Sequence, residues 1–171
     1  MKRVLVMGCP GCGKSTFSRR LRDITGLPLV PLDSIWWQPD TSHLTEEEFR
    51  PLLQIELEKD SWIIDGNFPL SAEVRLRYCD TVLLMDYPLE MCIQGILQRR
   101  GKPRPDMPFA QAFEDDEFLD YVRNYHANVR PHLMELVDQA RNLAEVTIFR
   151  TRQDAEDYLA ALEAKIKGEK R

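Results

Sequence analysis

Short apolar runs alternate along this chain with longer amphipathic stretches. The apolar runs have the length of buried strands, and glycines or prolines separate several of them from the next element. Strands that alternate with helices in this way are typical of a parallel sheet in an α/β fold. We expect the strands of that sheet over residues 4–7, 27–32, 61–65, 81–86 and 145–150.

The stretches between the strands repeat their apolar residues at three- to four-residue spacing, which predicts helices that pack on the sheet. Thr45 and Glu48 have the spacing of a capping box, so they predict where one helix begins. Pro131 predicts a kink or a restart in the longest helical stretch. Helices are expected over residues 14–24, 45–59, 89–100 and 113–140, followed by a last helix that Thr151 caps.

Three segments lack a regular pattern and are interpreted as loops. Residues 33–44 hold two tryptophans, a proline and several short polar residues. Residues 66–79 are expected to form a second loop, with room for a short helix. Residues 101–108 combine a glycine with several prolines, which predicts a loop between two helices.

The composition is that of an ordinary globular domain, with 43% apolar and 30% charged residues among 171. A chain of this length suggests a single domain. Its formal net charge of -5 disfavours general binding to nucleic acid or to anionic membranes, because both repel a net acid. No apolar run is long enough to predict a membrane span, and we expect a cytoplasmic protein. The sequence leaves its oligomeric state open.

Residues 8–15 fit the pattern Gly-x-x-x-x-Gly-Lys-Ser between a predicted strand and a predicted helix. Glycines let such a loop curl so that backbone N–H groups point at phosphate oxygens, and the helix N-terminus adds its positive dipole. Lys14 is expected to reach the β and γ phosphates of ATP, and the Ser15 hydroxyl to ligate Mg²⁺. The predicted phosphate-binding residues are Gly8, Cys9, Pro10, Gly11, Cys12, Gly13, Lys14 and Ser15.

Cys9 and Cys12 also form a Cys-x-x-Cys pair inside this loop. In thioredoxin-like proteins that spacing makes a redox pair. Here both cysteines fill variable positions of a phosphate loop, so a redox role is the weaker interpretation. All four cysteines are expected to be reduced, as in most cytoplasmic proteins.

Three segments together resemble the adenylate-kinase-like P-loop kinases. Residues 8–16 are similar to their phosphate loop, including its proline, and residues 62–66 are similar to their third strand, which runs into Asp-Gly. The pair Arg99-Arg100 before a proline-rich loop resembles the start of their lid. Residues 32–39, 65–68 and 104–107 resemble a narrower group among them, the proteins labelled DNA topology modulation protein.

The resemblance implies one P-loop kinase domain over residues 1–171. It implies three layers, with helices on both faces of a five-stranded parallel sheet of order 2-3-1-4-5. An acceptor-binding segment would span residues 33–78 and a short lid residues 100–108. The resemblance also adds Thr16 to the nucleotide site and gives Asp65 the role of holding the Mg²⁺ water shell.

Asp33 follows the second predicted strand, at the carboxyl edge of the sheet, where α/β proteins bind ligands. Adenylate kinases carry an arginine in this region, and another soon after Asp-Gly, to hold the phosphate of AMP. This chain has Asn67-Phe68 at the second place. A hydroxyl acceptor instead needs a carboxylate that takes its proton. Asp33 therefore favours an alcohol such as a sugar or nucleoside over AMP, although aspartate is also a common turn cap.

Further residues complete the predicted site. Trp36 and Trp37 are adjacent, so one can pack in the core while the other stacks on a base or a sugar. Arginines are expected to stabilise the charge that phosphoryl transfer builds on the γ phosphate. The predicted catalytic residues are Lys14, Asp33, Arg99, Arg104 and Arg130, and the predicted acceptor residues are Asp33, Trp36, Trp37, Asp65 and Arg75.

The sequence thus favours an ATP-dependent phosphotransferase that uses Mg²⁺ and acts on a hydroxyl-bearing nucleoside or sugar-like compound. One alternative is a nucleoside monophosphate kinase. Others are a nucleotide-dependent regulator associated with DNA, as the label of the similar proteins suggests, and a redox-sensing P-loop protein. The net acidic charge and the lack of a recognisable DNA-binding motif disfavour nucleic acid as a partner.

Overall fold

The computed structural model of the chain describes residues 1–102, 105, 107 and 116–169. One parallel sheet runs through it, with the strand order β2-β3-β1-β4-β5. The predicted fold class and strand order are thereby confirmed. The strands are β1 (Arg3–Gly8), β2 (Leu29–Pro31), β3 (Trp62–Asp65), β4 (Thr81–Met85) and β5 (Glu145–Phe149).

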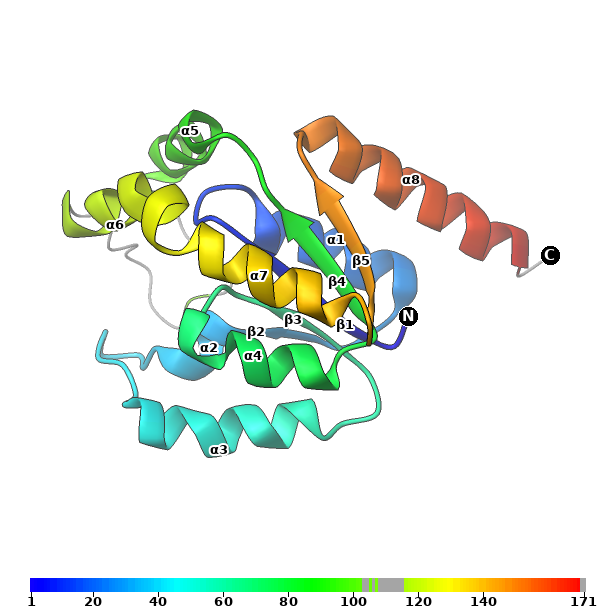
Figure 1. Ribbon diagram of the computed structural model, residues 1–171, viewed down its shortest axis with the longest axis horizontal. Coiled ribbons are helices and arrows are strands. Elements are labelled where there is room, and N and C mark those ends of the chain that lie inside the picture. The colour runs from blue at the N-terminus through cyan, green and yellow to red at the C-terminus, as the bar shows by residue number, and fades with distance from the viewer. Residues whose placement is uncertain (103–104, 106, 108–115, 170–171) are drawn as a thin grey trace.

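Helices cover both faces of the sheet (Figure 1). On one face α1 (Lys14–Thr25) packs against α8 (Arg152–Glu169), and on the other α4 (Pro69–Tyr78) packs against α7 (Arg130–Ala140). Strands β1, β3 and β4 are almost entirely buried because a parallel sheet covered on both sides exposes neither face. The remaining helices are α2 (Leu32–Trp36), α3 (Glu46–Leu57), α5 (Leu89–Arg99) and α6 (Asp116–Asn128).

Two segments interpreted as loops contain helices: the sequence predicts no helix in residues 33–44, whereas it allows a short helix in residues 66–79, where α4 forms. Residues 33–44 begin inside α2, and residues 66–79 hold the whole of α4. A proline at the first position of α4 is tolerated because the first turn leaves its N–H groups unbonded in any case. The buried face of α4 includes Arg75 between apolar residues, while Leu70 is 80% exposed. Because a buried position of α4 is charged and an exposed position is apolar, its sequence lacks the regular apolar spacing that predicts a helix.

The long helical stretch divides as the proline predicted. Helix α6 ends at Asn128, and α7 begins at Arg130 with Pro131 in its first turn. The start of the stretch and residues 103, 104, 106 and 108 of the predicted lid lie outside the described residues, so the structure does not place Arg104. Within the described ranges, no helix has the length and apolar content needed to cross a membrane.

Candidate active site

The loop between β1 and α1 curls around the ammonium group of Lys14. Gly11 and Gly13 have backbone φ angles of 84° and 102°, which residues with a side chain rarely adopt. The Lys14 Nζ atom donates to the carbonyl oxygens of Gly8 at 2.9 Å and of Cys9 at 3.1 Å. The loop therefore has the curl and the central cation that a phosphate site requires.

Two glycines let this loop lie directly on α5. A Cβ atom on Gly11 would stand 2.1 Å from the carbonyl oxygen of Cys92, and one on Gly95 would stand 2.1 Å from the carbonyl oxygen of Gly11. Both distances are far inside van der Waals contact. Gly95 sits inside a helix, where the sequence gave no sign of a role, and it fixes how closely the phosphate loop approaches α5.

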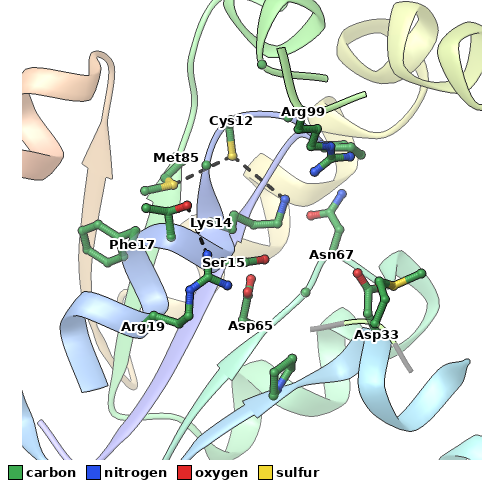
Figure 2. A pocket seen from close by; sticks show the side chains of 18 of the residues that line it. Cys12, Lys14, Ser15, Phe17, Arg19, Asp33, Asp65, Asn67, Met85 and Arg99 are labelled. Carbon is green, nitrogen blue, oxygen red and sulfur yellow. Dashed lines mark hydrogen bonds between the residues drawn. The ribbon is translucent and has the colours of Figure 1, made fainter. Parts of the chain in front are cut away.

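A cavity of about 820 Å³ lies beside the loop (Figure 2). It joins the phosphate loop and α1 to α2, to the end of β3 and to the end of α5. Gly8 and Cys9 are buried behind its lining. The predicted residues that line it are Pro10, Gly11, Cys12, Gly13, Lys14, Ser15, Thr16, Asp33, Trp36, Trp37, Asp65 and Arg99.

Lys14 is a protonated cation inside this cavity. Burial by itself lowers the pKa of its ammonium group, but electrostatic interactions with Cys12, Asp65, Cys9 and Asp33 outweigh burial, so the pKa lies above its usual value. A positive charge fixed at the centre of the loop is what a polyphosphate requires.

Ser15 and Asp65 fit a Mg²⁺ site. Asp65 is the last residue of β3 and pairs in register with Val6 of β1, the strand that leads into the phosphate loop. Figure 2 shows both side chains at the centre of the cavity, near Lys14. Mg²⁺ typically binds one or two protein oxygens together with phosphates and water. Among the residues described, no group of three His, Cys, Asp or Glu side chains could hold a metal ion.

Helix α2 and the segment after β3 form the part of the cavity where the sequence predicts an acceptor. Asp33 lies in the first turn of α2 and lines the cavity. The ring of Trp36 stacks on His43 at 4.9 Å between centroids and meets Phe68 edge-on at 5.6 Å. Trp36 and Trp37 both line the cavity, and both are half-buried. Neither of them therefore packs wholly in the core, as the sequence analysis expected for one of the two.

Arg75 does not reach the cavity as an acceptor contact. Its side chain is fully buried, and its guanidinium donates to the carbonyl oxygens of Gly66 at 2.9 Å, of Asn67 at 2.5 Å and of Phe68 at 3.1 Å. Burial lowers the pKa of Arg75 to about 10, which still leaves it charged at neutral pH. Arg75 thus holds the backbone after β3 in place rather than offering its charge to a ligand.

Arg130 is also placed elsewhere. Its Nε and Nη2 atoms donate to the two carboxylate oxygens of Asp86 at 2.7 Å and 2.8 Å, and Arg150 contacts the same carboxylate. The pair lies at the carboxyl end of β4, outside the cavity lining. Of the three predicted catalytic arginines, the described residues bring only Arg99 to the cavity.

Several cavity residues escaped sequence reasoning. The side chain of Asn67 lines the cavity and donates from Nδ2 to the Tyr125 hydroxyl at 3.0 Å. Phe68, Phe118 and Tyr121 line it as well. Asn67 and Phe68 could have been found, because they follow the Asp-Gly pair directly at the carboxyl edge of the sheet. The α6 residues gave no comparable signal, since tertiary packing alone brings that helix to the cavity.

The cysteines of the loop are buried thiols. The Cys12 sulfur approaches the Met85 sulfur at 3.8 Å, and burial raises the pKa of Cys12. A hydrogen bond with Cys92, together with burial, raises the pKa of Cys9. Because the thiolate is the reactive form, these environments favour packing over redox chemistry.

The strand order, the curled glycine loop and the cavity beside it define the class of P-loop α/β proteins. No model of a protein family matches the chain, and no curated protein matches it. Solved structures of similar fold exist, and they cover nearly the whole chain.

Shikimate kinase from Acinetobacter baumannii in complex with shikimate has a TM-score of 0.64 at 17% identity, with 99% of this chain and 95% of that chain covered. Shikimate kinase from Bacteroides thetaiotaomicron has a TM-score of 0.63 at 19% identity, with 97% and 98% covered. A gluconokinase from Sinorhizobium meliloti has a TM-score of 0.57 at 12% identity, with 97% and 91% covered. The chain therefore has the fold of the small P-loop kinases.

Proposed function

We propose that this protein is an ATP-dependent phosphotransferase that moves the γ-phosphate of ATP to a hydroxyl group of a nucleoside-like or sugar-like acceptor. One observation carries the proposal: Asp33 lines the same cavity as Lys14 and the phosphate loop. A phosphate-binding loop and a carboxylate that face one cavity are the two parts that transfer to a hydroxyl needs. The likeness to shikimate kinase and gluconokinase supports it.

Each residue has a defined task in this proposal. The backbone N–H groups of residues 11–15 and the Lys14 ammonium bind the phosphates, while Ser15 and Asp65 would hold Mg²⁺, which supplies further positive charge to them. Arg99, from the end of α5, stabilises the charge on the transferred group. Asp33 orients the acceptor hydroxyl and accepts its proton.

The position of Asp33 also supports a hydroxyl acceptor over a phosphate acceptor. A carboxylate repels an incoming phosphate, by about 1 kcal/mol in water at contact distance and by more in a closed cleft. Arg75, a cation within the predicted acceptor segment, has its guanidinium bound to backbone carbonyl oxygens. A nucleoside monophosphate kinase is therefore the weaker alternative.

The test is an ADP-release assay against a panel of nucleosides, nucleoside monophosphates and sugars. With the best acceptor, Asp33→Asn should lower kcat by about 100-fold or more and leave ATP affinity unchanged. Asp40→Asn, a matched change in the exposed part of the same segment, should leave kcat unchanged. Lys14→Ala is the inactive control, with an expected loss of about 100-fold or more.

The same assay separates the alternatives. If AMP or CMP is the best acceptor and Asp33→Asn keeps full kcat, the protein is a nucleoside monophosphate kinase. The resemblance to the DNA topology modulation proteins suggests a DNA-associated regulator instead. Salt-dependent, nucleotide-dependent binding to duplex DNA without phosphoryl transfer would favour that alternative.

A further inference from the structure

We infer that Gly95 is a positioning residue for phosphoryl transfer: because it has no side chain, α5 lies directly on the phosphate loop, and this contact places Arg99 at the phosphates that the loop binds. The inference rests on the proposed function and deepens it by assigning what holds the cation for the transferred group. Its basis is the contact between the loop and the face of α5 that carries Arg99.

Backbone atoms make the contact between the loop and α5. The Gly11 carbonyl oxygen would be 2.1 Å from a Cβ atom on Gly95, and real Cβ atoms essentially never approach another atom to within 3.0 Å. From the other side, a Cβ atom on Gly11 would be 2.8 Å from the Cγ1 atom of Ile96. Glycine is less favourable than alanine inside a helix by nature, so Gly95 weakens α5 at a place where a side chain would push the loop away.

The end of β4 holds the opposite side of the loop. A Cβ atom on Gly8 would be 2.5 Å from the carbonyl oxygen of Met85, and the Cys12 sulfur lies 3.8 Å from the Met85 sulfur. Strand β4 in turn pairs with β1 and with β5, so it is fixed inside the sheet. A close-packed interior transmits strain rather than absorbing it. An added side chain at Gly95 would therefore displace α5 as well as the loop.

Arg99 lies on the face of α5 that makes this contact. It follows Gly95 by four residues, about one helical turn, so the two residues share one side of the helix. Both of them line the cavity. In Figure 2 the Arg99 side chain points toward Lys14 and Asn67, which line it as well. A shift of α5 away from the loop would therefore carry the Arg99 guanidinium away from the γ-phosphate.

A small shift is enough to matter. A guanidinium donates to a phosphate oxygen at about 2.7–2.9 Å, and the interaction weakens steeply beyond that distance. Misplacement of a group by about 1 Å through a change far from the chemistry can lower turnover by about 100-fold. Gly95 thus acts on the reaction through Arg99 without touching the substrate.

The test is a double-mutant cycle on Gly95→Ala and Arg99→Ala, with binding as the first readout. Affinities for ADP and for a non-hydrolysable ATP analogue are measured by calorimetry, and their ratio isolates the contribution of the γ-phosphate. Turnover with the best acceptor is measured in parallel as ADP release. The controls are Gly168→Ala in α8, where the space is open, and Leu97→Ala on the exposed side of α5.

Arg99→Ala should weaken the ATP analogue relative to ADP by about tenfold or more, as expected for the loss of a hydrogen bond between charged groups. Gly95→Ala should weaken both nucleotides, because it presses on the loop, and the analogue by about threefold more than ADP, a partial loss of the same bond. In the Arg99→Ala background, Gly95→Ala should leave the ratio unchanged, because the residue through which it acts is gone. The value of kcat should follow the same pattern, and both controls should leave the ratio unchanged.

Equal weakening of ADP and of the analogue by Gly95→Ala overturns the inference, because Gly95 would then act on the loop alone. So do changes in the ratio that multiply in the double variant. If Gly95→Ala does not fold, Ile96→Val takes its place, since it loosens the same contact by a single carbon atom. An unchanged ratio in Ile96→Val then overturns the inference.

Failure of the proposed function has a different signature. In that case the affinity ratios follow the expected pattern, but no acceptor stimulates ADP release above the level of Lys14→Ala. If Arg99→Ala leaves the ratio unchanged, the inference is overturned whatever the turnover.

Discussion

The Nδ2 atom of Asn67 donates a hydrogen bond to the hydroxyl oxygen of Tyr125 at 3.0 Å, and so ties the segment after β3 to α6. Tyr125 is 2% exposed. The Oδ1 atom of the same amide is 3.5 Å from the backbone nitrogen of Gly8, at the entrance to the phosphate loop. One side chain after β3 thereby contacts both the start of the phosphate loop and α6, which contributes Phe118 and Tyr121 to the cavity lining.

Tyr125→Phe is expected to lower the free energy of unfolding by about 1 kcal/mol, because it leaves a half-buried amide without this partner. It should also raise the KM of the acceptor, since Asn67 is no longer held in one orientation. Urea unfolding and steady-state kinetics measure the two effects. Tyr78→Phe is the matched control: its hydroxyl accepts from Gln54 at 2.8 Å, far from the cavity, and only stability should change.

Arg75→Met is expected to cost about 3 kcal/mol of folding free energy or more. Methionine fills much of the volume but leaves the carbonyl oxygens of residues 66–68 without donors in a buried place. Arg77→Met, two residues along α4, removes only an exposed pair with Glu73 and should change stability by less than about 0.5 kcal/mol. Equal midpoints of chemical unfolding for the two variants would contradict the role assigned to Arg75.

Gly95→Ala and Gly168→Ala should act in opposite directions, although both lie in helices. Alanine is favoured over glycine in a helix by about 1 kcal/mol. Space around Gly168 is open, so its replacement should stabilise the protein or leave it unchanged. At Gly95 the new Cβ would press on the Gly11 carbonyl, so we expect lower stability and weaker binding of an ATP analogue. Calorimetry of unfolding and of nucleotide binding measures both, and normal affinity in Gly95→Ala would argue against the contact.

Asp86 should make stability depend on acid pH. Burial by itself raises the pKa of Asp86, but hydrogen bonding and charge from Arg130, with charge from Arg150, bring it below the ordinary value. A carboxyl group whose pKa falls on folding stabilises the protein above its unfolded pKa and loses that contribution as the pH falls through its folded pKa.

Asp86→Asn is therefore expected to cost about 1–2 kcal/mol at neutral pH, a value reduced because Arg130 is partly exposed. The difference in unfolding free energy between Asp86→Asn and the wild type should become smaller below about pH 4. Urea titrations at neutral pH and at about pH 3 measure it, with the exposed Asp120→Asn as control. If this difference in unfolding free energy stayed constant across the range, Asp86 would stabilise the protein through packing rather than through its charge.

The strands and the phosphate loop could both be predicted from the sequence, and for different reasons. The apolar runs around β1, β3 and β4 are continuous because both faces of the sheet are covered, so they stand out without any tertiary information. The glycine loop is recognisable because its backbone angles and its lysine are local requirements of phosphate binding. The strand order itself came from resemblance rather than from periodicity.

Only the tertiary structure decided which polar residues face the cavity. Arg75 and Arg130 looked as suitable as Arg99 by sequence, but one turns onto the carbonyl oxygens after β3 and the other onto Asp86, 44 positions away. Gly95 and Tyr125 had no local signal, because the loop and the amide that they touch lie far along the chain. The spacing of apolar positions along the chain indicates which side chains are buried. The residue that a buried side chain contacts depends on which distant segments the fold brings together. The sequence by itself therefore determined the strands and the glycine loop of this protein, and long-range packing determined which side chains line the cavity beside that loop.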